Sequence, residues 1–207
     1  MITFELVTPQ ILSVTAPQEL LPLIFCRYQE HYESPKFRGK IFSMAEYKQW
    51  YVHTYGQWSY VKDWSAFNIP SEILRPFVNG DFAPLDDETE GRLLNPAISA
   101  LHGTTSGYII GTVNRTCADF KHELSHAFYR LDSAYKQRID TVLSLHQVAV
   151  SKIKQTLKKM GYCNEVLDDE AHAYLLDNDN RKIIPTSYLD IAKKIQAVFN
   201  EKHGGIK

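Results

Sequence analysis

The sequence predicts an α+β protein, with mixed structure in about residues 1–115 and mostly helical structure in about 116–207. In the first part, short segments rich in β-branched or aromatic residues are typical of strands. In the second part, apolar residues recur at helical spacing almost without interruption. At 207 residues the chain is long enough for one domain with a sizeable core, so we expect a single domain over 1–207.

The first part is expected to combine a small sheet with short helices. The patterns predict strands within 2–7, 64–69 and 106–114. They predict helices within 18–32, 44–56 and 71–78. Aromatic residues are dense between Tyr47 and Trp64, and we interpret that cluster as packing rather than as a binding groove.

The second part is expected to consist of helices. From Tyr135 to Gly161 the apolar spacing predicts one long helical segment, with His146 on its apolar stripe as a core residue. A further helix is expected around Glu170, and a last one after the segment 185–187.

Composition excludes several kinds of partner. The 23 basic and 24 acidic residues nearly balance, which argues against nucleic acid. Cys26, Cys117 and Cys163 form no CxxC pair, so neither a disulfide framework nor a thiolate zinc site is predicted. Because no secretory signal or membrane span is recognisable, we expect a cytoplasmic protein without a membrane partner, although signals of specialised export systems would not show in this pattern. The pattern does not predict an oligomeric state.

The stretch FKHELSHAFYRLD, from Phe120 to Asp132, carries the motif HExxH. On a helix, the apolar residues of this stretch fall on one face, and His122 and His126 fall nearly opposite. Histidines four positions apart are one turn apart, so both can reach a single ion. We therefore expect the two imidazoles to share one accessible face and to bind a metal.

This motif suits zinc-dependent hydrolysis. Zinc lowers the pKa of its water toward ~7, and an adjacent carboxylate can take the proton as that water attacks a carbonyl. Glu123 lies directly after His122 and is the candidate for this general base.

A catalytic zinc site needs a third protein ligand. Glu170 lies in the middle of an apolar helix face, where a metal would compensate a buried carboxylate. A salt bridge to a buried Lys or Arg is the alternative explanation for Glu170. Asp132 competes as ligand but lacks the glycine turn that such a compact site requires. Asp168 and His172 point away from Glu170, and Asp169 lies on the flank of the helix. We expect these three side chains to be solvated.

Together these residues resemble the zincin metallopeptidases of the gluzincin type, over roughly residues 106–177. The resemblance implies Zn²⁺ bound by His122, His126 and Glu170, with Glu123 as general base. It also implies a zincin-like fold in which the active-site helix follows an edge strand, here within 106–114, that pairs with an extended peptide substrate.

The chain departs from this pattern in its supporting residues. Thermolysin-like enzymes place an aspartate four positions after the ligand glutamate to orient a histidine, and here that position is Tyr174. Tyr162 resembles their oxyanion-stabilising tyrosine, with Tyr174, Tyr129 and His172 as alternatives.

The sequence therefore predicts a zinc metallopeptidase acting on a protein or peptide. The alternative is a zincin-derived binding or regulatory module that keeps a structural metal without turnover. Glu123 favours the enzyme, because a purely structural site needs no general base.

Overall fold

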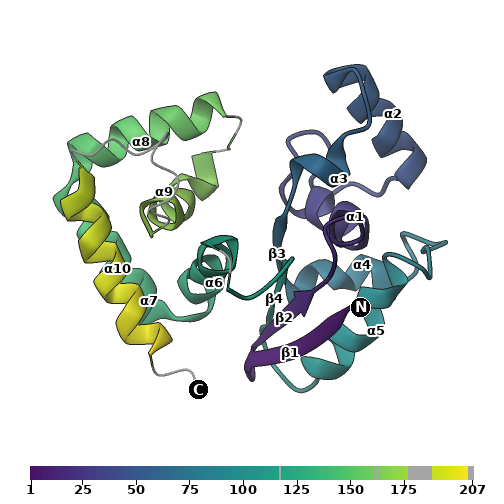
Figure 1. Ribbon diagram of the computed structural model, residues 1–207, viewed down its shortest axis with the longest axis horizontal. Coiled ribbons are helices and arrows are strands. Elements are labelled where there is room, and N and C mark those ends of the chain that lie inside the picture. The colour runs from purple at the N-terminus through teal and green to yellow at the C-terminus, as the bar shows by residue number, and fades with distance from the viewer. Residues whose placement is uncertain (117, 161, 163, 177–187, 205–207) are drawn as a thin grey trace. The chain divides into compact units, whose positions relative to one another are not determined.

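The computed structural model describes residues 1–116, 118–160, 162, 164–176 and 188–204 (Figure 1). The chain divides into two compact units, Met1–Phe120 and Lys121–Lys207. The first unit contains a sheet and helices, and the described part of the second contains helices. The predicted α+β class, mixed first and helical afterwards, is confirmed. The metallopeptidase-like single domain stays a prediction.

The first unit is built on a four-stranded mixed sheet. Its strands are β1 (Thr3–Thr8), β2 (Ile11–Thr15), β3 (Ala66–Pro70) and β4 (Tyr108–Thr112), in the order β1-β2-β4-β3. β2 runs parallel to β4, and the other two pairs are antiparallel. All five residues of β4 are buried, as expected for an apolar strand covered on both faces.

The strand that precedes the HExxH helix is an inner strand, so the prediction of an edge strand was wrong. Each residue of β4 is paired in register with β2 on one side and with β3 on the other. The reason is β2, a short strand that the sequence patterns did not reveal. Because both edges of β4 are occupied, an extended substrate cannot pair with it.

Helices pack around this sheet. They are α1 (Leu21–Glu33), α2 (Met44–Tyr55), α3 (Tyr60–Asp63), η1 (Ser71–Leu74), α4 (Arg75–Val78) and α5 (Gly91–Ala100). α1 comes so close to β4 that a Cβ added at Gly111 would overlap the ring of Phe25. The aromatic residues between Tyr47 and Trp64 are mostly core, with Tyr47 and Tyr60 buried, which confirms the packing interpretation.

The second unit is helical in its described residues. Its elements are α6 (Ala118–Leu131, which begins in the first unit), α7 (Ser133–Leu145), α8 (Gln147–Lys159), η2 (Asn164–Val166), α9 (Leu167–Leu176) and α10 (Leu189–His203). α7, α8 and α10 all pack against α9, which places α9 at the centre of the unit. No helix among the described residues is long and apolar enough to span a bilayer.

The long helix predicted from Tyr135 is two helices. α7 ends and α8 begins at His146, whose backbone leaves the helical region at φ −125° and ψ 33°. The apolar spacing continues from Leu143 to Val150 through this break, so periodicity alone could not reveal it. His146 is only partly buried and its ring contacts Lys194 at 3.1 Å, so its assignment to the core was wrong. Gly161, Cys117 and Cys163 lie outside the described residues.

Candidate metal centre

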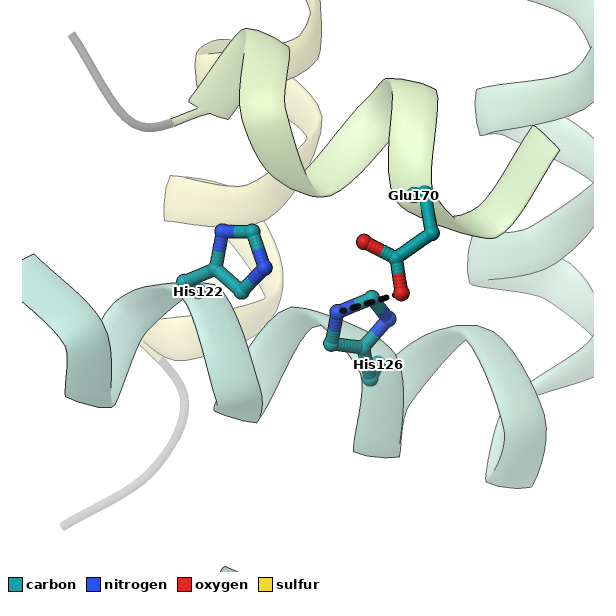
Figure 2. A group of neighbouring side chains, drawn as sticks. All are labelled: His122, His126 and Glu170. Carbon is teal, nitrogen blue, oxygen red and sulfur yellow. Dashed lines mark ion pairs between the residues drawn. The ribbon is translucent and has the colours of Figure 1, made fainter. Parts of the chain in front are cut away.

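α6 presents both histidines of the motif to the same space. Its apolar residues Leu124, Ala127 and Phe128 are fully buried on one side. His122 and His126 lie on the other side, with ring centroids 5.0 Å apart. This side is not open, however, because α9 lies across it (Figure 2) and His126 is only 2% exposed. The helical periodicity thus predicted the common face correctly but not its burial.

Glu170 on α9 completes the predicted group of three. One ligand atom from each of His122, His126 and Glu170 lies within 4.8 Å of the other two. The carboxylate oxygen Oε1 of Glu170 is 3.8 Å from Nε2 of His126 (Figure 2). Two elements separated by more than 30 residues of sequence therefore bring together two imidazoles and one carboxylate.

These residues fit a divalent metal ion. Two imidazole nitrogens and one carboxylate oxygen are a donor set typical of catalytic zinc. Oε2 of Glu170 is buried and has no hydrogen-bond partner among the described residues, which is costly unless a cation binds there. No Lys or Arg of the described ranges forms an ion pair with Glu170, so the alternative of a buried salt bridge lacks its cation.

Asp132, the competing ligand, serves another purpose. Its side chain caps α7 by accepting hydrogen bonds from the backbone N–H groups of Ala134 and Tyr135, both at 2.9 Å. It also forms an ion pair with Lys202 at 2.6 Å. These contacts account for its carboxylate as a helix N-cap.

Asp169 orients one of the histidines, a role that the sequence analysis missed. Its Oδ1 lies 2.8 Å from Nδ1 of His126. With the proton on Nδ1, the imidazole donates to Asp169 and leaves Nε2, the nitrogen nearer Glu170, free for a metal. The expectation that Asp169 is merely solvated was wrong. Its neighbour Asp168 is solvated as expected, with a side chain 52% exposed and paired with Lys154.

His172 was also expected in solvent and is instead completely buried, at 0% exposure. Its ring stacks on Tyr129, with centroids 4.8 Å apart. Helical spacing predicted that His172 points away from Glu170, but α9 also packs against neighbouring helices where His172 lies. Every residue of α9 from Glu170 to Leu176 is buried, and this cannot be seen in the sequence of the helix itself.

Burial and neighbouring charges shift the pKa values of His122, His126 and Glu170. Burial lowers the pKa of His122 well below its usual value. For His126, burial acts in the same direction, but the carboxylates of Asp169 and Glu170 outweigh it and raise the pKa of His126 well above its usual value. Burial raises the pKa of Glu170 to about 7. The charge of Glu123 also raises the pKa values of His126 and Glu170, so this residue lies close to both. Glu123 is itself only 8% exposed.

Two tyrosines, Tyr162 and Tyr174, lie at the His122 end of the group. The hydroxyls of Tyr162 and Tyr174 are 3.1 Å apart, and the ring of Tyr174 packs edge-on against His122 with centroids 5.1 Å apart. The hydroxyl of Tyr129 instead donates to Asp140 and accepts from Lys136, away from the ligands. The oxyanion-stabilising role of Tyr162 stays a prediction.

Comparisons of the chain with protein-family models, with curated proteins and with solved structures find no match.

Proposed function

We propose that the chain is a zinc-dependent metallopeptidase of the gluzincin type, acting on a protein or peptide. The observation that supports it is the convergence of His122, His126 and Glu170, with an unpaired carboxylate oxygen buried among them. Such a donor set leaves a coordination position for a water or substrate oxygen.

The proposed roles follow from the positions of the side chains. His122, His126 and Glu170 would hold the ion, which when bound supplies Lewis acidity toward a carbonyl and a water. Glu123, buried next to His122 on α6, accepts the proton of the attacking water and returns it to the leaving amine. The hydroxyl pair of Tyr162 and Tyr174 supplies a donor for the negative charge that develops on the carbonyl oxygen.

Metal analysis combined with a cleavage assay tests this function. The purified protein should contain close to one zinc per chain. The Glu123→Gln variant should keep the zinc and lose turnover of a peptide library by about 100-fold or more, since an amide cannot accept the proton.

Absence of metal after gentle purification would contradict the proposal. Unchanged cleavage by Glu123→Gln would assign the base to another residue. Full zinc content without cleavage by either form would favour a binding or regulatory module in which the metal is structural.

A further inference from the structure

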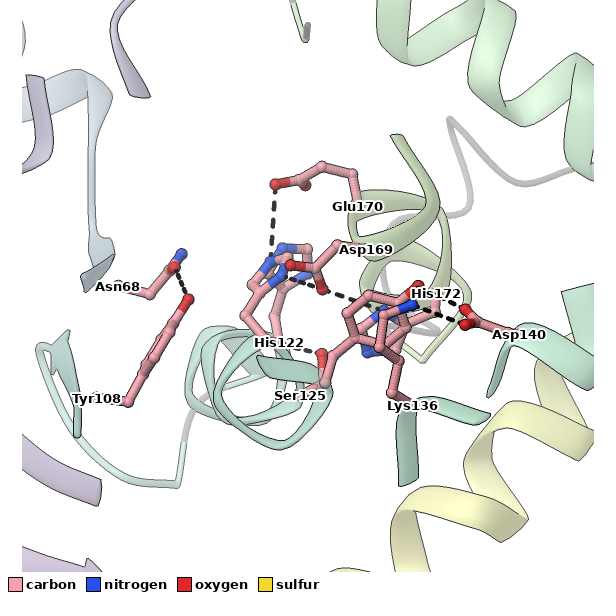
Figure 3. A network of polar contacts seen from close by, with 11 residues as sticks. Asn68, Tyr108, His122, Ser125, Lys136, Asp140, Asp169, Glu170 and His172 are labelled. Atoms are coloured by element: carbon pink, nitrogen blue, oxygen red, sulfur yellow. Dashed lines mark hydrogen bonds and ion pairs between the residues drawn. The ribbon is translucent and has the colours of Figure 1, made fainter. Parts of the chain in front are cut away.

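Asp169 lies between two imidazoles of different surroundings. Its Oδ1 is 2.8 Å from Nδ1 of His126. The same oxygen is 3.4 Å from Nδ1 of His172, and Figure 3 labels both Asp169 and His172. The first contact has hydrogen-bond geometry. The second joins positions i and i+3 of α9, and it connects Asp169 to the interior of the second unit.

His172 is held firmly from its other sides. Its ring stacks on Tyr129 at an interplanar angle of 22° and meets Tyr135 edge-on with centroids 6.0 Å apart. Tyr129 is itself fixed through its hydroxyl by Asp140 and Lys136. A buried aromatic ring enclosed in this way has little freedom to change rotamer.

Asp169, in contrast, has a route to solvent. Its side chain is 25% exposed, so its carboxylate could turn outward and leave Nδ1 of His126 without an acceptor. Neither nitrogen of His172 makes a well-formed hydrogen bond among the described residues, although the backbone carbonyls of Asp169 and Ser125 lie near the ring. An imidazole ring carries at least one N–H donor in either of its protonation states.

We propose that His172 is a positioning residue of the metal site, which holds the Asp169 carboxylate against Nδ1 of His126 and thereby keeps Nε2 of His126 directed at the ion. This inference rests on the proposed metal site. It adds a chain of support, from Tyr129 through His172 and Asp169 to His126, that lies entirely within the second unit.

A double-mutant cycle measured by zinc titration against a competing chelator tests the proposal. Asp169→Ala should weaken zinc binding by about 10- to 100-fold, the usual effect of losing a partner of a ligand histidine. His172→Phe, which keeps a ring but removes the donor, should weaken it by about 10-fold. The double variant should bind like Asp169→Ala alone, because His172 acts through Asp169. Additive losses, or an unchanged affinity of His172→Phe, would overturn the proposal.

His172→Asn provides a matched variant, because its amide nitrogen can occupy the place of Nδ1 although the ring is lost. It should bind zinc more tightly than His172→Phe. If His172→Asn binds zinc more weakly than His172→Phe and also unfolds at a lower temperature, His172 serves packing alone and the proposal is wrong.

A measurement without metal separates this inference from the proposed function. In the metal-free protein, nitrogen-15 NMR should show a slowly exchanging Nδ1–H of His126 in the wild type, and faster exchange of it in His172→Phe. If the wild type takes up no zinc, the proposed function fails, and the NMR comparison still decides whether His172 positions Asp169. Equal exchange in both proteins would refute the positioning role even where zinc binds.

Discussion

Asp168 and Asp169 are adjacent carboxylates with the same chemistry and different surroundings. Asp168 pairs with Lys154 at the surface, whereas Asp169 accepts from His126. We predict that Asp169→Ala weakens zinc binding by about 10- to 100-fold and that Asp168→Ala leaves it unchanged. A chelator titration of both variants measures this, with Asp168→Ala as the matched control. Equal losses in the two variants would point to the general charge of α9 instead of an oriented histidine.

The raised pKa of Glu170 predicts that the stability of the metal-free protein depends on pH. Its pKa rises from 4.5 to about 7 on folding, so the folded state holds this proton more tightly than the unfolded state. The resulting stability is present below pH ~4.5 and is lost as the pH rises through about 7. Glu170→Gln, which cannot titrate, should remove this loss, and metal-free wild type should become less stable relative to it by about 3 kcal/mol between pH 4.5 and 8.

Urea unfolding of both proteins in the presence of a chelator at several pH values measures this difference. A constant gap between the two proteins across this range would contradict a buried, ionisable Glu170. The same variant should fail to retain zinc, because an amide replaces the charged ligand.

At the scale of elements, local patterns predicted the helices that carry the candidate ligands and not the environments of those helices. α6 and α9 were both expected around their ligands, and the apolar face of α6 was placed correctly. The periodicity of α9 could not show that neighbouring helices bury all of its residues from Glu170 to Leu176, so the roles of Asp169 and His172 were missed. Likewise β4 was recognised as a strand, but its inner position depends on pairing with β2 and β3, which is not encoded in its own residues.

The contact of α1 with β4 makes a prediction for the sheet. Gly111→Ala should destabilise the first unit by about 1–3 kcal/mol, because its Cβ overlaps the ring of Phe25 in a close-packed core. The double variant Gly111→Ala with Phe25→Leu should recover part of this loss, since a smaller side chain makes room. Thermal or urea unfolding checks both. A destabilisation that Phe25→Leu does not relieve would show that the overlap is not its cause.

At the scale of the whole molecule, the residues of the candidate site belong to the second unit. The three candidate ligands come from α6 and α9, and the residues that contact them come from α6, α7 and α9 within Lys121–Lys207. The sequence predicted this concentration of chemistry in the helical part, because HExxH and Glu170 both fall there. It could not predict how α7 and α9 surround His172, since contacts between helices depend on tertiary packing.

Zinc should therefore stabilise the two units unequally. A ligand that binds only the folded state at 100 times its Kd adds about 2.7 kcal/mol of stability to the structure that must be formed for binding. Hydrogen exchange with and without zinc should show this as slower exchange of the backbone amides of α6 and α9, with a smaller change in β2 and β4. The Glu170→Gln variant serves as control, because it should show no zinc effect in either unit. Equal slowing in both units would mean that the chain unfolds as one cooperative domain. Slowing confined to the sheet would place the bound zinc outside the group formed by His122, His126 and Glu170.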